Sequence, residues 1–406
     1  MTEILRSDVL IIGGGPAGLA AAKAASDGTL RVTVLEKSLE IGYPIHTSGG
    51  SWTRELRALG VPEQYIHPIR TLQFISSGNE ASFDYDFPEI CVIDIRAVYQ
   101  NWAEQASLQG AVIHTNTLAQ ELLYEEGKLC GVKAVRNGNP IIYKAKVLID
   151  ASGFSALVAR QSGLSSPSQS YGKGAEYEIV TKSWSQDKTA ILLGSAFTPV
   201  GYGWVFPYGK HRVRVGVGVL APYSKADPMP LLEAFLAGSH PLAQKLQPYS
   251  ILETHFGSVP NSGYIAKSYA DNLLIAGDAA GQVLGLAGEG IRLAYDIGMM
   301  AGQTAAEAIA HGDTSEQQLA RYETLWKKKY ARSIDLNARL NGIVSSYTDA
   351  QWDRALDILK DVDPEIVLAL MKGYFDLRLV KLILSRNPGL FAHNAMKIIR
   401  KAVTGS

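Results

Sequence analysis

Short apolar runs, set apart by polar and glycine-rich stretches, dominate the hydrophobic pattern of this chain. Residues 9–12, 32–35, 147–149 and 273–276 are almost purely apolar, as is typical of parallel strands that are buried on both faces. Residues 212–219 instead place valine at every second position, which indicates an antiparallel strand with one covered face. We therefore expect two kinds of sheet in one chain.

Helix and turn signals fall between these runs. Residues 119–135 indicate a hairpin that turns at Gly127. Beyond residue 315 the chain is predicted to be mostly helical, with breaks at Pro364 and Pro388. The other helices predicted from the spacing of apolar positions cover residues 53–59, 97–109, 230–236 and 290–310.

Composition narrows the function classes. The net charge is +0 and hydrophobic residues make up 47%, so the chain is globular without an electrostatic signature of nucleic-acid binding. Cys91 and Cys130 match no disulfide framework and no metal-binding spacing, which suits a reducing compartment. No apolar run reaches the length of about 18 residues that a membrane-spanning helix needs. We therefore expect a cytoplasmic protein of two or three domains that holds no metal.

A glycine-rich turn lies between the first two apolar runs. Gly13, Gly15 and Gly18 have the spacing G-x-G-x-x-G, and Glu36 ends the second run. Strand, helix, strand and acid in this order form the dinucleotide-binding fingerprint. The glycines allow a tight turn and the close approach of a pyrophosphate at the helix N-terminus, and the acid accepts hydrogen bonds from ribose hydroxyls. Further expected contacts of the dinucleotide are Pro16, Ala17 and Lys37.

Two further motifs lie far downstream. Residues 202–207 are Tyr-Gly-Trp-Val-Phe-Pro, and Gly-Asp-Ala-Ala-Gly at 277–281 is followed by Gly-Glu-Gly-Ile at 288–291. With these motifs in this order, the chain resembles the FAD-dependent geranylgeranyl reductase family. That family lies within the glutathione-reductase-type flavoproteins, which also include aromatic hydroxylases and flavin halogenases. Weaker signatures of the same family are residues 174–178 and 322–327.

The resemblance implies an α/β fold with three parts. These are a Rossmann-type FAD-binding domain, an inserted antiparallel-sheet substrate domain and a helical C-terminal region. The expected bounds are 1–70, 91–165 and 262–311 for the discontinuous FAD-binding domain, 71–90 and 166–261 for the substrate domain, and 312–406 for the helical region.

The implied cofactor is FAD, with NADPH or a ferredoxin as the electron donor. Asp278 matches the family aspartate that accepts hydrogen bonds from the ribityl hydroxyls. The helix that opens at 288–291 would turn backbone N–H groups toward the N1/O2 edge of the isoalloxazine. Arg96 matches the family arginine that lies against the FAD. The remaining matched cofactor residues are Ala151, Gly153, Gly277, Gly288, Glu289, Gly290 and Ile291.

The implied reaction is the reduction of carbon–carbon double bonds in a polyprenyl chain of geranylgeranyl type, an apolar isoprenoid or lipid. Tyr202, Trp204 and Phe206 alternate along one expected strand and so project from one face. This arrangement fits a long apolar substrate above the flavin, although aromatic residues are also ordinary core material. Tyr43 and Pro44 complete the expected pocket.

This sequence departs from the family where the reacting groups are expected. The family usually has P-x-x-C facing the flavin, whereas this chain has proline, isoleucine, histidine and threonine at 44–47. Saturating a double bond needs a hydride and a proton, so another group must replace the cysteine if the cysteine takes part. A histidine has the most useful unperturbed pKa, although one in such a loop is also an ordinary hydrogen-bond donor. The expected catalytic residues are His46, Thr47, Tyr202 and Trp204.

Other functions stay open at this stage. A flavin monooxygenase or halogenase acting on an aromatic or apolar metabolite has a similar W-x-x-P motif, and a non-catalytic electron-transfer flavoprotein would need no substrate pocket. The tail over 377–403 mixes basic and apolar residues, which fits either peripheral attachment to an anionic membrane or helices packed on the protein. The oligomeric state is left open.

Overall fold

The computed structural model describes residues 2–26, 28–165 and 168–374, and these form two compact units. Both units are discontinuous in sequence. The separate helical region was expected over 312–406, and the part of it that the structure describes is divided between the two units after Ala331. Unit 1 comprises the described parts of Met1–His67, Val92–Tyr171 and His255–Ala331, and unit 2 comprises those of Pro68–Cys91, Gly172–Thr254 and Arg332–Ser406.

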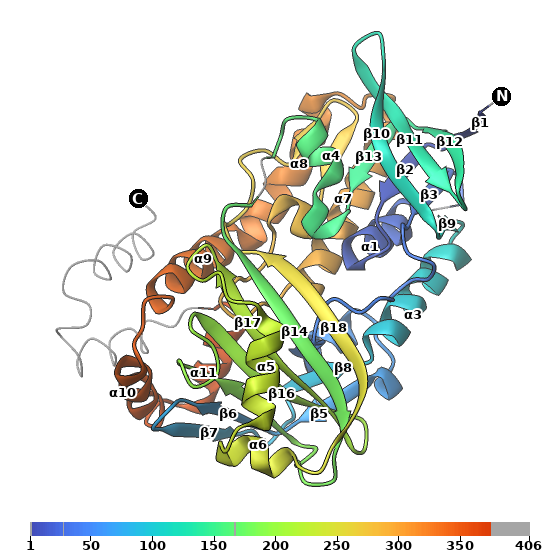
Figure 1. Cartoon of the computed structure of the whole chain (residues 1–406). Coiled ribbons are helices and arrows are strands. Elements are labelled where there is room, and N and C mark those ends of the chain that lie inside the picture. Colours follow the sequence, from blue (N-terminus) through green and yellow to red (C-terminus); the bar gives the residue numbers. More distant parts are fainter. Residues whose placement is uncertain (1, 27, 166–167, 375–406) are drawn as a thin grey trace. The chain divides into compact units, whose positions relative to one another are not determined.

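A six-stranded sheet forms the centre of unit 1 (Figure 1). Its strands are, in spatial order, β19 (Tyr269–Ala270), β20 (Leu273–Ile275), β13 (Val147–Asp150), β2 (Val9–Ile12), β3 (Val32–Leu35) and β9 (Val112–His114). All neighbours are parallel except β19, which pairs antiparallel at one edge. Every residue of β2, β3, β13 and β20 is buried, because their apolar runs face protein on both sides. The predicted Rossmann-type arrangement is confirmed.

Helices cover one face of this sheet. α1 (Pro16–Ala25) and α7 (Ile291–Ala310) run side by side on it (Figure 1). α3 (Ile95–Leu108) packs against α1, and α8 (Glu316–Trp326) packs against α7. A Cβ atom at Gly298 of α7 would lie 2.2 Å from the Ala17 carbonyl oxygen, and one at Gly302 would lie 2.2 Å from that of Ala21. The two helices therefore touch backbone to backbone.

A four-stranded sheet covers the opposite face. Its strands are, in spatial order, β1 (Glu3–Arg6), β12 (Asn139–Lys144), β11 (Lys128–Arg136) and β10 (Thr117–Glu125). β10 and β11 form the predicted hairpin, with Gly127 at φ 79° in its turn. Leu122 and Val132 of this sheet join Leu10 and Leu148 of the central sheet in one buried cluster. The parallel sheet thus lies between helices and a second sheet.

Shorter elements complete unit 1 and the passages between the units. β4 (Gly50–Trp52), α2 (Thr53–Ala58) and α4 (Leu157–Gln161) belong to unit 1, and α2 confirms a predicted helix. A π-helical turn, Lys327–Ala331, follows α8. The chain passes between the units within β5 (Ile66–Ile69), β8 (Ile90–Ile93) and β18 (Ser250–Pro260). It also passes between them after Tyr171, the first residue of β14, and after Ala331.

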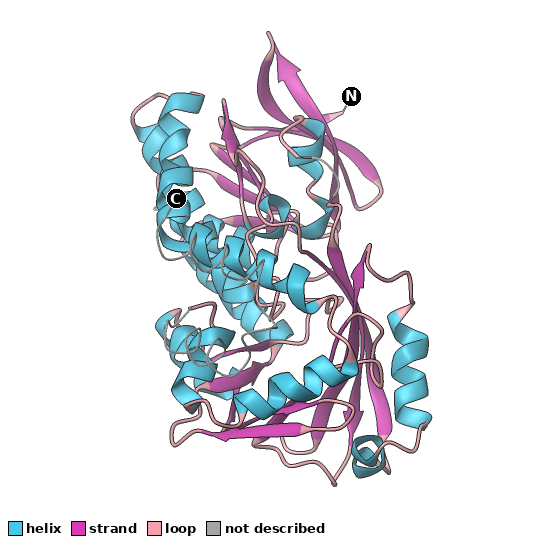
Figure 2. Cartoon of the chain, turned by 90° about the vertical axis from the view of Figure 1, so that its left-hand side faces the viewer, coloured by secondary structure: helices cyan, strands magenta, loops and turns pink. Residues whose placement is uncertain are grey.

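A seven-stranded sheet forms the centre of unit 2. Its strands are, in spatial order, β18, β14 (Tyr171–Val180), β17 (Arg212–Ala221), β16 (Gly201–Tyr208), β15 (Lys188–Leu192), β6 (Thr71–Ile75) and β7 (Glu80–Asp84). As the alternation predicted, Val213, Val215 and Val217 are buried on one face, where they pack with α5 (Pro228–Ala237) and α6 (Pro241–Leu246). The sheets and helices of each unit can be followed by colour in Figure 2.

Three helices complete the described part of unit 2: α9 (Arg332–Val344), α10 (Asp349–Leu359) and α11 (Pro364–Met371). Pro364 occupies the first turn of α11, where a missing N–H costs nothing, so the predicted break at this proline is confirmed. The break predicted at Pro388 and the tail over 377–403 lie outside the described residues. Within the described ranges, no helix is both long and apolar enough to cross a membrane.

Candidate functional site

The glycines of the fingerprint are required by backbone contacts in unit 1. Gly13 has φ 111°, and a Cβ atom there would lie 2.2 Å from the carbonyl oxygen of Ala151 at the end of β13. A Cβ atom at Gly18 would lie 1.9 Å from the carbonyl oxygen of Gly13. The turn between β2 and α1 therefore fits closely against the neighbouring strand end, and no other residue type fits at either position.

The N-terminus of α1 is suited to binding an anion. Gly15 is its N-cap residue and Pro16 its first residue, and no side chain caps the helix. A Cβ atom at Gly15 would meet nothing within 4 Å, so open space lies over the backbone at this point. Free N–H groups at a helix N-terminus attract negative charge. The predicted place for a pyrophosphate, beside Gly15, Pro16 and Ala17, thus has both the room and the donors.

Glu36 is fixed at the end of β3 by backbone donors. One carboxylate oxygen accepts the Gly14 N–H at 2.8 Å and the other accepts the Ser38 N–H at 2.7 Å. The two bonds hold the carboxylate beside the glycine-rich turn with further lone pairs open to a ligand hydroxyl. The neighbouring Lys37 side chain is exposed.

Asp278 lies in a short 3-10 turn, Gly277–Ala280, directly after β20. Among the described residues, no hydrogen-bond donor contacts its carboxylate. Although the side chain is partly accessible, enclosure by the protein raises the pKa of Asp278 to about 6, because the charged form loses water without gaining a donor. A ligand that brings hydroxyl groups to this position would supply the missing donors.

Gln282, which the sequence did not single out, and Tyr322 of the weak family signature hold this turn in place. The Gln282 side chain, which is fully buried, accepts the Gly277 N–H at 2.7 Å and donates to the hydroxyl of Tyr322 at 3.3 Å. That hydroxyl in turn donates to the Ile275 carbonyl oxygen at 2.8 Å. The weak family signature at 322–327 thus includes a residue that braces the Asp278 turn.

The turn at Ala151 and Gly153 is held by the last residue of β13. Asp150 is completely buried, and its two carboxylate oxygens accept the Ser152 N–H at 3.0 Å and the Ala159 N–H at 2.8 Å. Burial raises the pKa of Asp150 above its usual value, against the effect of these bonds. The carboxylate fixes the turn against which Gly13 packs.

The loop before α7 is closed by its own backbone and by a buried ion pair. The N–H of Glu289 donates to the Leu284 carbonyl oxygen at 3.2 Å, and its own carbonyl oxygen accepts the Leu284 N–H at 3.0 Å. The Glu289 side chain binds Arg292 through two bonds of 2.8 and 3.1 Å. Gly288 has φ 63°, and Gly290 begins α7 without a side-chain cap. The donors open to a ligand here belong to Gly290 and Ile291 rather than to Glu289.

Arg96 lies near the start of α3 with an exposed side chain. Its guanidinium binds Glu40 at 2.8 Å, and a Cβ atom at Gly42 would lie 2.9 Å from the Arg96 Cα, so residues 40–42 pack on this helix. One turn further along α3, Tyr99 is close enough for the negative charge of Asp278 to raise its pKa, in addition to the larger effect of burial. No sequence pattern marks Tyr99, because its proximity to Asp278 depends on how α3 packs.

The loop that carries His46 is attached to β18. The His46 Nδ1 lies 2.8 Å from the carbonyl oxygen of Phe256, so Nδ1 carries the hydrogen of that bond. A Cβ atom at Gly257 would lie 2.2 Å from the His46 carbonyl oxygen, which shows how closely strand and loop approach. The His46 side chain is exposed, as are Tyr43 and Pro44, whereas Thr47 is partly buried.

In unit 2, Tyr202, Trp204 and Phe206 of β16 form a row on one face of the sheet, as their alternation predicts. The ring centroids of Tyr202 and Trp204 are 5.9 Å apart, and those of Trp204 and Phe206 are 6.4 Å apart. Val205 points to the opposite face, into the aliphatic core. We call these three residues the aromatic row.

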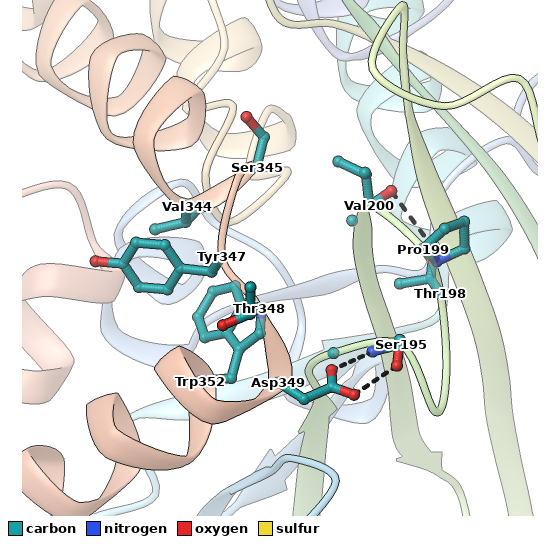
Figure 3. Close-up of a pocket in the computed structure, with 12 residues that line it drawn as sticks. Ser195, Thr198, Pro199, Val200, Val344, Ser345, Tyr347, Thr348, Asp349 and Trp352 are labelled. Atoms are coloured by element: carbon teal, nitrogen blue, oxygen red, sulfur yellow. Dashed lines mark hydrogen bonds between the residues drawn. The ribbon is translucent and has the colours of Figure 1, made fainter.

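A separate cavity of 260 Å³ lies elsewhere in unit 2. Figure 3 shows its two facing walls, the segment before β16 and the connection between α9 and α10, with Asp349 hydrogen-bonded to Ser195 across one end. Its lining mixes aromatic, aliphatic and hydroxyl groups. Among the described residues, no cluster of histidine, cysteine or acidic side chains could hold a metal ion.

Comparison with known proteins places this geometry in a family. The family model described as FAD dependent oxidoreductase matches residues 8–168, and the one described as geranylgeranyl reductase catalytic domain matches residues 171–259. A digeranylgeranylglycerophospholipid reductase of Methanosarcina mazei is 32% identical over 382 residues, covering 91% of this chain and 92% of the relative. One from Methanocella arvoryzae is 30% identical over 400 residues, covering 94% and 97%. The chain belongs to the geranylgeranyl reductase family.

Solved structures share the fold of this chain. A geranylgeranyl bacteriochlorophyll reductase-like protein from Thermoplasma acidophilum superposes with a TM-score of 0.85, at 24% identity, over 96% of this chain and 98% of that one. The flavin-dependent brominase Bmp2 gives a TM-score of 0.73 at 18% identity, over 98% of both chains. These likenesses concern the fold. The predicted family, fold class and FAD-dependent oxidoreductase activity are confirmed.

The residues of unit 1 fit FAD. The uncapped start of α1, the carboxylates of Glu36 and Asp278, and the uncapped start of α7 all lie at or beyond the carboxyl ends of parallel strands, where α/β sheets bind ligands. Asp278 in particular is a desolvated acceptor that has no donor among the residues that the structure describes. The roles of the individual residues stay predictions.

Proposed function

We propose that this protein saturates carbon–carbon double bonds in the polyprenyl chains of a geranylgeranyl lipid. The observation that carries the proposal is the aromatic row, which lies within the segment matched by the geranylgeranyl reductase catalytic domain. The names of the relatives, which are digeranylgeranylglycerophospholipid reductases, support a lipid as the substrate.

The proposed roles in unit 1 follow the parts of FAD. The N–H groups at the start of α1 would bind the pyrophosphate, Glu36 the ribose hydroxyls and Asp278 the ribityl hydroxyls. The N–H groups of Gly290 and Ile291 would face the isoalloxazine edge. When bound and reduced, FAD supplies the hydride for one carbon of the double bond.

His46 is the proposed source of the proton for the other carbon. Its Nδ1 is engaged with the Phe256 carbonyl oxygen, so Nε2 is the ring atom that can carry and release a proton. Thr47 occupies the position of the family cysteine. Since a hydroxyl is a far weaker acid than an imidazolium, we assign Thr47 a hydrogen-bonding role beside His46.

The aromatic row is the proposed binding surface for the apolar chain. Tyr202 and Phe206 flank Trp204 along β16. Both are partly buried, whereas Trp204 is only 8% exposed, so the accessible apolar surface of the row lies on either side of the indole. An isoprenoid has no hydrogen-bonding groups along its length, so apolar surface is what binds it.

An anaerobic turnover experiment tests this function. The bound flavin is reduced with NADPH, NADH or reduced ferredoxin in separate reactions, which identifies the donor. Reduced enzyme is then mixed with geranylgeranyl lipids and the products are weighed by mass spectrometry. We expect a gain of two hydrogens for each bond reduced. Unchanged lipid with every donor, or NADPH consumption that requires oxygen and a small aromatic substrate, would contradict the proposal and favour a monooxygenase or halogenase.

A further inference from the structure

The indole of Trp204, the middle residue of the aromatic row, lies over the backbones of Gly174, Gly216 and Gly218. We call these three residues the glycine floor. Trp204 pairs with Gly216 across β16 and β17, and a Cβ atom at Gly216 would come within 2.2 Å of the indole ring. Cβ atoms at Gly174 of β14 and at Gly218 would lie 3.3 and 3.4 Å from other atoms of the same ring. The indole therefore extends from its own strand across the backbones of two neighbours, and a side chain at 216 would displace it.

Glu176 fixes the indole in this position. The Trp204 Nε1 donates to a Glu176 carboxylate oxygen at 2.6 Å, and the Glu176 side chain is only 3% exposed. Glu176 lies two residues beyond Gly174 on β14, and so on the same face of the sheet. Burying a carboxylate is costly unless its hydrogen bonds are made. The position of the indole is thus determined twice, by the glycines beneath it and by the acceptor at its edge.

The two faces of the sheet differ in what they can do. The face toward α5 is filled by the branched side chains of Val205, Val215 and Val217, which interlock with the helix as an ordinary core. The face with Trp204 has glycine where a branched side chain would stand. Along β17, Gly218 is paired with Tyr202 and Gly216 with Trp204, whereas Arg214 is paired with Phe206. Glycine thus leaves room for the rings at the first two positions of the row, where a side chain would displace them.

We infer that Glu176 is a positioning residue for the polyprenyl substrate, and that Gly216 sets the depth of the surface on which the chain lies. This inference rests on the proposed function. Glu176 acts through Trp204: it holds the buried indole against the backbones of the glycines beneath it. The indole then does not project past the partly exposed rings of Tyr202 and Phe206, along which an extended isoprenoid would lie. The residues that determine the fit are therefore on β14 and β17, beside the motif on β16.

Four variants separate positioning from structure. Glu176→Gln keeps an acceptor for the indole N–H, whereas Glu176→Leu removes it. Trp204→Phe removes the donor, and Gly216→Ala places a methyl group beneath the indole. Val217→Ala is the matched control, because Val217 is next to Gly216 on β17 but points into the aliphatic core. Each variant is assayed as reduced holoenzyme with a geranylgeranyl lipid, together with its FAD content and its Tm.

The KM values decide the inference. We expect Glu176→Leu, Trp204→Phe and Gly216→Ala each to raise KM about tenfold with kcat little changed, since one hydrogen bond or one displaced ring is lost. The double variant of Glu176→Leu and Trp204→Phe should be no worse than either single variant. Glu176→Gln should remain close to wild type, and Val217→Ala should lower Tm without raising KM. Independent effects in the double variant, or an equal rise of KM in Val217→Ala, would overturn the inference.

A binding measurement keeps the inference separate from the proposed reaction. A saturated polyprenyl lipid, which cannot react, is titrated into the oxidised holoenzyme while tryptophan fluorescence is followed. If wild type reduces no double bond yet binds this lipid, and Glu176→Leu loses that binding while Glu176→Gln keeps it, the reaction is wrong and the positioning role stands. If wild type binds no polyprenyl lipid, or if all variants bind it equally, the positioning role is refuted.

Discussion

Asp278 makes the binding of FAD sensitive to pH. In the protein without ligand its pKa is raised to about 6, and hydrogen bonds from ribityl hydroxyls would favour the charged form and lower the pKa again. Below pH 6 the site must lose a proton to bind FAD, so the affinity should fall by about tenfold for each pH unit. Titration of apoprotein with FAD, followed by flavin fluorescence over this pH range, measures the effect.

Asp278→Asn provides the matched control for this prediction. It should bind FAD more weakly at neutral pH, and its affinity should no longer change with pH. In the folded apoprotein the pKa of Asp278 is raised from the usual 3.8 to about 6. Ionisation of the carboxylate therefore destabilises the folded apoprotein increasingly over this pH range, and the loss of stability persists at higher pH. The Asn variant without FAD should therefore be no less stable than wild type at neutral pH. A less stable variant would indicate a structural role.

His46→Asn tests the proton source. The Asn side-chain N–H₂ can take the place of Nδ1 toward the Phe256 carbonyl oxygen, so the loop keeps its bond to β18, but the ring nitrogen that would donate the proton is gone. We expect kcat to fall about a hundredfold, with FAD content unchanged. His46→Phe serves as a comparison that also breaks the loop contact. If His46→Asn kept the kcat of wild type, His46 would have only a structural role.

Among individual residues, the sequence predicted those that belong to motifs and missed those that hold the motif residues in place. Gly13, Glu36 and Asp278 could be found because their spacing from strand ends is characteristic. Gln282 and Tyr99 could not, since each reaches the site only through the packing of a loop or helix against distant residues. A buried glutamine in a loop has no pattern in the sequence that distinguishes it from an exposed one.

Among the elements, the contact between α1 and α7 leaves no space for additional atoms. Since a Cβ atom at Gly298 or Gly302 would lie 2.2 Å from a backbone oxygen of α1, Gly298→Ala and Gly302→Ala should each destabilise the protein by about 3 kcal/mol and weaken FAD binding by moving α1. Urea unfolding and FAD titration measure both effects. Gly342→Ala in α9, where a Cβ atom would meet nothing, is the control and should stabilise by up to about 1 kcal/mol.

The attachment of α10 to the sheet of unit 2 depends on an ionised carboxylate. Bonds from Ser195 lower the pKa of Asp349 below its usual value of 3.8, so the group contributes stability at pH values above that value and loses it as pH falls further. Asp349→Ala should cost about 1 kcal/mol at neutral pH, since the group is partly exposed and the bonds are screened. Asp349→Asn keeps the shape of the side chain without its charge and is the matched control. A loss that grows toward acidic pH would have the wrong sign.

The elements themselves were largely predictable. Buried parallel strands and the alternating strand over 212–219 each have a strong local pattern, and the hairpin at Gly127 needs only its own turn. The pairing of strands was not predictable. The glycines at 216 and 218 were assigned only to an alternating strand, because nothing local places them beneath Trp204 of another strand.

For the whole molecule, the balanced charge gives no general attraction to a membrane. If the enzyme docks on an anionic surface, a local basic segment must be responsible, and we propose the tail over 377–403. Changing Lys397, Arg400 and Lys401 to Gln should weaken binding to phosphatidylserine vesicles by about 3 kcal/mol, or roughly a hundredfold. Salt should weaken wild-type binding in the same way.

A control with the same change of charge makes this result specific. Lys128, Lys210 and Lys225 are exposed in the described part of the chain, and their replacement by Gln should leave vesicle binding nearly unchanged. Equal losses in the two triple variants would show that charge anywhere on the surface suffices. In sedimentation with vesicles, no binding of wild type at low salt would refute the tail as an anchor.

The order of strands in unit 1 has a consequence for how the protein is made. β2 lies between β3 and β13, and β13 lies between β2 and β20, so the first motif to leave the ribosome needs partners that are synthesised much later. Until residues 273–291 have emerged, the chain has a phosphate-binding turn but neither Asp278 nor the start of α7. A nascent chain stopped before residue 273 should therefore hold no FAD. Loading with cofactor is reserved for chains in which all three segments of unit 1 have been translated, however early the fingerprint appears.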